Sequence, residues 1–294
     1  MKNIFFIKIK YFLEYLLIFL IHNILYVLPI NFSSNIGGFL FRLIGPFTKQ
    51  NYVAKKNYLK IFPLAKKMEV AEAVNNSWSN SGKTFAELLI LPRIIKNHKN
   101  IVKIEGEQYL ENIKKNKDQA IFIGIHESNW ELLIPIIDRL GISLGAIYRH
   151  INNPYINKLI VNLRNKSLKS KKSFYTPKGK ESAKDIINAL KMNLSAIMLI
   201  DQKDSSGEYI EFFNTKVKTQ IGFLKLARKY KIKIIPVHNI RDKKNNFTIK
   251  FYKPFEIHFN ELNNSEQMKK IHEIIEGWIK ENPSNWFLQH NRFN

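Results

Sequence analysis

The first apolar run of the chain lies near its N-terminus. Residues 11–30 read YFLEYLLIFLIHNILYVLPI, about the length that a helix needs to cross a bilayer core. Glu14, His22 and Asn23 interrupt the run, and no small-x-small cleavage site follows it, which disfavours a signal peptide. We therefore predict an N-terminal membrane anchor over residues 1–35, formed by a transmembrane helix, with a buried soluble helix as the alternative.

A second apolar stretch, residues 36–47, is too short to span a membrane. It contains Gly37, Gly38, Gly45 and Pro46. We expect residues 36–64 to form an interfacial segment that lies against the membrane surface. Lysines follow at positions 49, 55, 56 and 60, where anionic lipid headgroups would attract them. The larger basic load lies after the first apolar run, which favours a cytoplasmic main domain.

The remainder of the chain alternates between helical and strand-like patterns. Apolar residues recur at helical spacing over 70–90. After Pro92, strands are predicted at 102–104, 120–125, 142–147, 196–200, 209–213, 232–237 and 247–252. Helices are predicted at 108–115, 131–140, 157–166, 180–192, 221–231 and 265–280. Uninterrupted apolar strands such as AIFIGI are typical of buried parallel strands. We therefore predict one α/β domain over residues 65–294, with a mixed, mostly parallel sheet flanked by helices.

Composition narrows the possible functions. The chain has no cysteine, which excludes disulfides, a thiolate nucleophile and a cysteine-ligated metal. Its formal net charge is +23, with 47 Lys and Arg against 24 Asp and Glu. The chain carries no zinc-finger, basic-zipper or RNA-recognition motif, so we expect no nucleic-acid partner. Attraction to anionic membrane lipids or to an acidic substrate fits this charge, as does a compositional drift towards lysine.

A histidine and a carboxylate form the best candidate reactive centre. His126 directly follows the strand AIFIGI, at the sheet edge where open α/β folds bind ligands. Glu131 lies five residues later, where it could fix the tautomer of the imidazole and stabilise the imidazolium. The spacing alone is weak, because roughly 0.65 such pairs arise by chance in this composition. The alternative is a capping box over Ser128–Glu131 that satisfies only backbone groups.

Three further polar residues are candidates for substrate binding. Arg149 and Asp201 each follow a predicted strand, which places them at the same sheet edge as His126. A guanidinium there could grip a phosphate or a carbonyl, and Asp201 could orient Arg149 or a substrate hydroxyl. Arg164 lies in a predicted helix among lysines, so a solvated helix face is its alternative reading.

The segment around His126 resembles the His-x4-acid motif of glycerolipid-type acyltransferases. Over almost its full length, the chain resembles the late acyltransferases of lipid A biosynthesis. The resemblance rests on an ordered series of blocks: Asn57-x4-Phe62-Pro63, Val102-x-Ile104-Glu105-Gly106, Tyr148-Arg149, Asn153-Pro154, Arg164, Asp201-Gln202, Phe212-Phe213, Thr219, Pro236-Val237 and Pro283-x2-Trp286-x3-His290-x-Arg292. Two positions depart from the family pattern, since Asn193 and Asn214 stand where glycine is common.

This resemblance implies a glycerolipid acyltransferase-like fold and direct transfer of a fatty acyl chain. The implied donor is acyl-carrier protein, and the implied acceptor is a lipid A precursor bearing Kdo sugars. His126 would act as general base with Glu131, and Arg149, Arg164 and Asp201 would bind substrate. No metal or other cofactor is implied. Transfer to another membrane lipid is an alternative, as is a non-catalytic basic protein that binds membranes.

Overall fold

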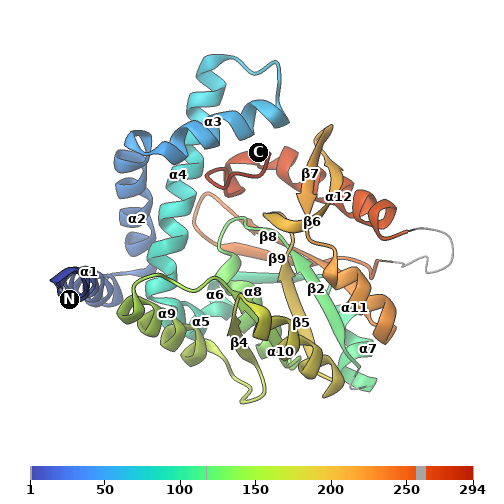
Figure 1. The fold of residues 1–294 in the computed structure, drawn as a ribbon. Helices are drawn as coiled ribbons and strands as arrows, with labels where there is room; N and C mark the ends of the chain where they lie inside the picture. Colours follow the sequence, from blue (N-terminus) through green and yellow to red (C-terminus); the bar gives the residue numbers. More distant parts are fainter. Residues whose placement is uncertain (1, 117, 256–262, 294) are drawn as a thin grey trace.

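The computed structural model describes residues 2–116, 118–255 and 263–293. Within this part, seven strands form the central sheet in the order β1-β9-β8-β2-β5-β3-β4 (Figure 1). Their bounds are β1 Val102–Glu105, β2 Ala120–Gly124, β3 Leu144–Tyr148, β4 Phe174–Pro177, β5 Ser195–Leu199, β8 Lys233–Arg241 and β9 Phe247–Phe251. Neighbouring strands run parallel except β8 and β9, which are antiparallel. The predicted α/β class with a mostly parallel sheet is confirmed.

Alternate residues of β2 face two separate cores. Ile121 and Ile123 belong to one hydrophobic cluster, whereas Ala120 and Phe122 belong to the other. The first core is covered by α10 Lys180–Lys191, α11 Gly222–Tyr230 and α12 Asn264–Glu281. The second is covered by α5 Leu91–Lys96, α7 Gln108–Asn116, α8 Leu133–Arg139 and α9 Pro154–Ser167. A strand buried on both faces explains the continuous apolar sequence of β2.

The remaining elements lie around this sheet. A separate antiparallel hairpin joins β6 Lys203–Phe212 to β7 Thr215–Thr219. The short helical elements are η1 Gly45–Phe47, α6 His98–Ile101, η2 Trp130–Leu132 and η3 Pro283–Asn285. The sequence analysis missed β4 and β7, whose short mixed sequences FYTP and TKVKT show no long apolar run.

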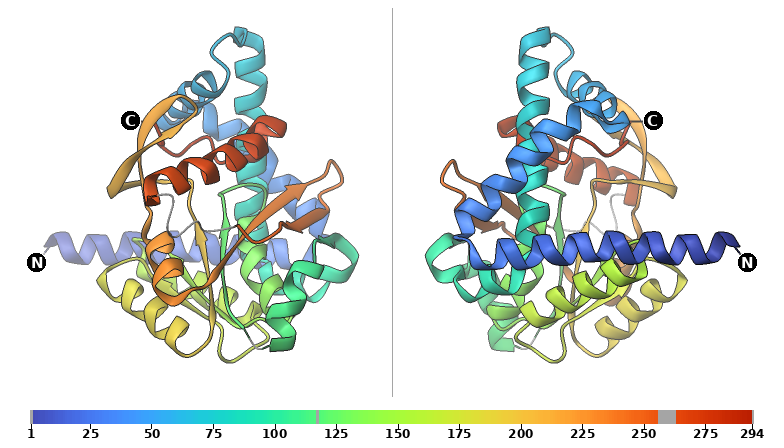
Figure 2. Two further views of the ribbon diagram at one scale, coloured as in Figure 1. Left: turned by 90° about the vertical axis from the view of Figure 1, so that its right-hand side faces the viewer. Right: turned by 90° about the vertical axis from the view of Figure 1, so that its left-hand side faces the viewer.

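The N-terminal helices pack on the α/β domain instead of standing apart from it. They are α1 Lys2–Val27, α2 Ile30–Ile44, α3 Lys49–Ile61 and α4 Lys67–Leu89. Figure 2 shows α1 as a long rod across the outside of the molecule. The boundary predicted between residues 35 and 36 falls within α2. Contrary to the predicted transmembrane helix, no helix in the described part of the chain is both long and apolar enough to cross a membrane.

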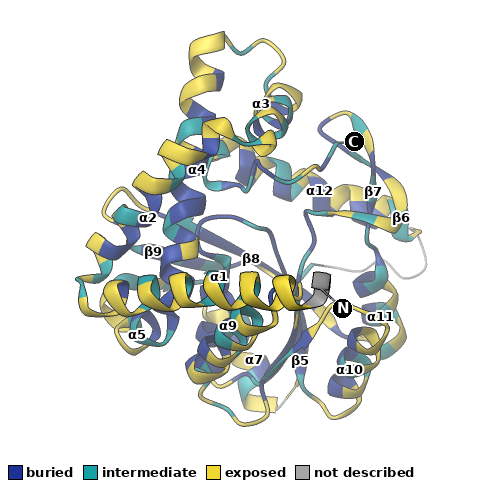
Figure 3. Cartoon of the chain, turned by 60° about the vertical axis from the view of Figure 1, so that its left-hand side comes forward, coloured by how far each residue is buried: buried dark blue, intermediate teal, exposed yellow. Residues whose placement is uncertain are grey.

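The polar residues that interrupt α1 explain how it lies. Glu14 accepts a hydrogen bond from Asn153 Nδ2 at 2.9 Å, and His22 Nδ1 lies 2.7 Å from the carbonyl oxygen of Leu89. These contacts turn the polar positions towards the domain. The opposite side of the helix is exposed and largely apolar (Figure 3).

Helices α2 and α4 approach closely through two glycines. A Cβ atom on Gly82 would lie 2.1 Å from the carbonyl oxygen of Gly37, and one on Gly37 would lie 2.4 Å from that of Gly82. Since contacts this short are not tolerated, only glycine allows the two backbones to meet here.

Candidate active site

Strand register brings His126 and Asp201 together. Gly124 of β2 pairs with Leu199 of β5 in parallel register, so the residues that follow the two strands emerge side by side at the carboxyl edge. His126 Nδ1 lies 2.8 Å from Asp201 Oδ1. The imidazole is 18% exposed, whereas the carboxylate is only 3% exposed. The pair therefore presents one open nitrogen to solvent or substrate and keeps its acid buried.

Asp201 is held in its ionised form. Burial raises its pKa, but the charge and hydrogen bonds of His126 and the indole N–H of Trp286 outweigh burial and lower the pKa to about 2. Trp286 Nε1 donates to Asp201 Oδ2 at 2.8 Å. Because an ionised carboxylate can only accept hydrogen bonds, Nδ1 of His126 carries the proton. Nε2 is then the nitrogen free to accept a proton from a substrate.

Glu131 has a different partner from the one predicted. Its carboxylate is bound bidentately by Arg164, with Nε to Oε2 at 2.8 Å and Nη2 to Oε1 at 2.6 Å. Both side chains are nearly buried, at 11% exposure for Arg164 and 7% for Glu131. The predicted contact of Glu131 with His126 is therefore wrong, because Asp201 occupies that position.

The capping-box alternative for Glu131 is also wrong. Asn129 caps the short helix η2, since its side chain accepts a hydrogen bond from the backbone N–H of Glu131 at 3.1 Å. The carboxylate of Glu131 is thus free to pair with Arg164. Arg164 is nearly buried, so the alternative reading of it as part of a solvated helix face is wrong. The rings of Tyr148 and Tyr175 flank the guanidinium, with centroids 5.3 and 5.8 Å from its carbon.

A pocket of about 780 Å³ opens beside His126. His126, Glu131, Arg149 and Arg164 all line it, so the structure brings four of the five predicted site residues to one cavity. Asp201 does not line the pocket but lies behind His126. The apolar part of the wall includes Phe85, Leu88, Trp130, Ile134, Ala146, Ile147, Ile151, Ile156, Ile197, Leu199 and Phe287. Arg149 is exposed, so a cationic group borders this apolar space.

The C-terminal segment completes the site, although none of its residues was among the predicted site residues. Besides the Trp286 bond to Asp201, Phe287 N donates to His126 O at 2.8 Å. His290 lines the pocket, and its Nε2 accepts from the N–H of Lys203 at 3.0 Å. Burial lowers the pKa of His290 to about 4. The signal for these roles was the closing Trp286–Arg292 block of the family resemblance.

A second acid–histidine pair joins the loop between β2 and η2, residues 125–129, to β8. Glu127 Oε2 is 3.1 Å from His238 Nε2, and both side chains are buried. His238 stacks on Trp278 with a centroid separation of 4.6 Å. Burial raises the pKa of Glu127. Because neither group lines the pocket, this pair supports the loop instead of contacting substrate. Within the described residues, no group of three or more His, Cys, Asp or Glu side chains is arranged to hold a metal ion.

A histidine whose second nitrogen is fixed by a buried carboxylate, beside a large apolar pocket, defines a centre that can take a proton from a hydroxyl. The sequence model of the bacterial lipid A biosynthesis acyltransferase family matches residues 2–294. The chain therefore belongs to this family and is an acyltransferase, as the resemblance had implied.

Other comparisons add little to this assignment. The crystal structure of the 1-acyl-sn-glycerophosphate (LPA) acyltransferase PlsC from Thermotoga maritima is similar to this chain at 18% identity, with a TM-score of 0.38. The similarity covers 85% of this chain and 97% of that chain. No curated protein matches the chain.

Proposed function

We propose that this acyltransferase moves a fatty acyl chain from acyl-carrier protein to a hydroxyl of a lipid A precursor of the Kdo-bearing type. The His126–Asp201 pair at the mouth of a large, mainly apolar pocket carries this proposal. The apolar wall suits a hydrocarbon chain, and Arg149 suits the phosphates of the acceptor. The net charge of +23 suits both an acidic carrier protein and an anionic lipid.

In the proposed reaction, Nε2 of His126 takes the proton of the acceptor hydroxyl. The oxygen attacks the thioester carbonyl, and the resulting oxyanion collapses with departure of the thiolate. The imidazolium returns its proton to the thiolate, so an ester and a thiol are the products. Asp201 stabilises the imidazolium in the meantime. Arg149 and nearby backbone N–H groups are our candidates for binding the oxyanion or a phosphate.

Direct transfer is favoured over a covalent acyl-enzyme. The chain has no cysteine to form a thioester intermediate. Its Gly-x-Ser-x-Gly sequence at residues 141–145 is not the strand-to-helix elbow that serine acyl-enzymes use, because Ser143 lies at the amino end of β3 and does not line the pocket. The histidine therefore acts on the acceptor hydroxyl itself.

We further propose that the enzyme works on the cytoplasmic face of the inner membrane, attached through its N-terminal helices. The exposed side of α1 includes Phe12, Leu13, Leu16, Leu17 and Leu20, each at least 43% exposed. In α2, Phe39 is 66% exposed and Leu43 is 58% exposed. An exposed apolar surface of this extent is typical of an interfacial, membrane-lying helix.

Competing substrates test the proposed reaction. Purified enzyme is incubated with acyl-carrier thioester and equal amounts of a Kdo-bearing lipid A precursor and lysophosphatidic acid, and the products are identified by mass spectrometry. We expect the acyl chain on the lipid A precursor, and none from an Arg149→Ala variant at limiting acceptor. Transfer only to lysophosphatidic acid would identify another acceptor. No transfer to either lipid would contradict the proposed function.

A further inference from the structure

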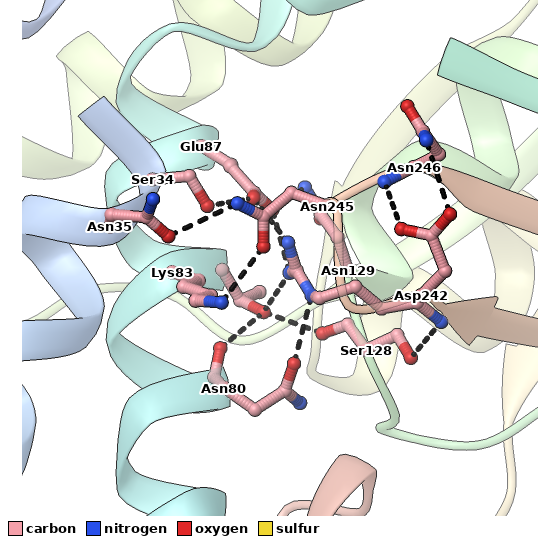
Figure 4. A network of polar contacts seen from close by, with 12 residues as sticks. Ser34, Asn35, Asn80, Lys83, Glu87, Ser128, Asn129, Asp242, Asn245 and Asn246 are labelled. Atoms are coloured by element: carbon pink, nitrogen blue, oxygen red, sulfur yellow. Dashed lines mark hydrogen bonds and ion pairs between the residues drawn. The ribbon is translucent and has the colours of Figure 1, made fainter. Parts of the chain in front are cut away.

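The carboxylate of Glu87 in α4 lies where three parts of the fold meet. Its side chain is 1% exposed. Ser34 of α2 donates to Oε1 at 2.5 Å, and Arg241 of β8 donates to both oxygens. Asn129, in the loop between β2 and η2 that also contains His126, donates to Oε2 at 2.8 Å. Figure 4 shows Ser34, Glu87 and Asn129 converging from these separate elements. Four donors thus share one buried carboxylate.

Arg241, the main partner of Glu87, also contacts the side chain of Ser128 in the loop between β2 and η2. Its backbone N–H donates to Ser128 Oγ at 3.0 Å, and its Nε donates to Asn80 Oδ1 at 2.9 Å. Thr84 Oγ1 donates to the carbonyl oxygen of Ser128 at 2.5 Å. Ser128 has a φ of 47°, a left-handed conformation that a non-glycine residue adopts only when its surroundings impose it. The network around Glu87 supplies that constraint.

A second connection reaches α2 by way of the turn between β8 and β9. Lys83 Nζ donates to Asn245 Oδ1 at 2.8 Å, and Asn245 Nδ2 donates to Asn35 Oδ1 at 3.1 Å. Figure 4 shows these three side chains beside the Glu87 group. Helix α2 is therefore joined through polar contacts to the same elements that hold Ser128 and Asn129.

We propose that Glu87 and Arg241 are positioning residues for acyl transfer. Through its hydrogen bond to Glu87, Ser34 makes the geometry of this pair depend on how α2 is packed. Neither charged group lines the active-site pocket, so both act through their contacts with the side chains of Ser128 and Asn129. Removing the carboxylate leaves Arg241 and the amide of Asn129 buried without their acceptor, which is costly. The loop then loses the orientation that places His126 beside Asp201. The kinetic part of this inference rests on the proposed acyl transfer.

Three variants separate positioning from general stability. Glu87→Gln removes the charge while keeping the size of the side chain. Ser34→Ala removes only the direct hydrogen bond from α2 to Glu87. Ser33→Ala is the matched control, since Ser33 is equally buried at 0% exposure but donates to the carbonyl oxygen of Leu25 within the N-terminal helices. Hydrogen exchange of the peptide containing residues 126–131 and steady-state kinetics are measured on folded protein.

We expect Glu87→Gln to speed exchange of the loop amides at least tenfold and to lower kcat by roughly 10- to 100-fold with little change in KM. Ser34→Ala should shift both quantities in the same direction by a smaller factor, and it provides the test if Glu87→Gln does not fold. Ser33→Ala should change neither. Wild-type exchange and kcat in folded Glu87→Gln, or in Ser34→Ala if that alone folds, would overturn the proposal. Wild-type enzyme that transfers no acyl chain would refute the proposed function, while the exchange measurement would still decide the positioning role.

Discussion

Replacing Asp201 by asparagine tests the pairing that the structure assigns to His126. Asparagine keeps the size of the side chain and can still accept from Trp286, but it carries no charge to stabilise the imidazolium. The contacts of Asp201 lower its pKa from 3.8 to about 2 despite burial. This shift, to which burial and Trp286 also contribute, corresponds to about 2 kcal/mol of preference for the ionised carboxylate in its surroundings.

A loss of about 2 kcal/mol in the transition state reduces the rate on the order of 30-fold. The amide of asparagine can also favour the wrong imidazole tautomer, which adds to the loss. We therefore expect kcat to fall by at least 30-fold on this basis. The effect is measured as the single-turnover rate of acyl transfer near pH 7.5, roughly the pH of the cytoplasm.

Asp138→Asn is the matched control for this substitution. Asp138 is also a buried carboxylate, at 2% exposure, but it binds the backbone N–H groups of Lys169 and Ser170 away from the pocket. We expect Asp138→Asn to reduce stability and leave kcat of the folded enzyme near the wild-type value. A kcat for Asp201→Asn within about twofold of wild type would refute the reasoning, because that change is below even 0.5 kcal/mol.

Four further predictions concern the active site and the stability of the fold. Glu131→Gln weakens the ion pair with Arg164, so it should raise KM for the lipid acceptor while lowering kcat less than Asp201→Asn does. Unchanged steady-state kinetics would show that the ion pair is only structural. Gly82→Ala should lower the free energy of unfolding by about 1–3 kcal/mol, because its Cβ would clash with backbone. Gly277→Ala in α12 meets nothing within 4 Å and should be neutral or stabilising by urea denaturation. Burial lowers the pKa of His272 and of His290 from 6.5 to about 4. As the pH falls, these histidines therefore take up protons in the unfolded chain before they do in the folded protein. The free energy of unfolding should fall between pH 6.5 and pH 4, by up to about 3 kcal/mol for each histidine, and a flat stability profile over that range would contradict this prediction.

The sequence was sufficient to predict a mostly parallel sheet and to place His126 at its carboxyl edge. The buried run of β2 could be recognised because a strand covered on both faces must be apolar throughout. The position of His126 followed from the rule that ligands bind at the carboxyl edge of such a sheet. The strands β4 and β7 were missed because their stability depends on neighbouring strands that local sequence does not reveal.

The partner of His126 could not be predicted from local spacing. Asp201 lies 75 residues away and meets His126 only because β2 and β5 are adjacent and in register. Glu131 was the nearest acid along the chain, but the fold places Arg164 beside it. The orientation of α1 was hidden for a similar reason, since Glu14 and His22 find their partners on the domain surface and not in the helix itself.

The central claim is that His126 takes the proton from the acceptor hydroxyl. The most direct measurement is the single-turnover rate of acyl transfer by His126→Ala, with the acyl-carrier thioester and the lipid A precursor both saturating. We expect wild-type enzyme to form the ester. His126→Ala, folded and still bound to vesicles, should form it at least 1,000-fold more slowly, on the order of the contribution of a general base. Ester formation by His126→Ala at a rate close to that of wild type would contradict the account.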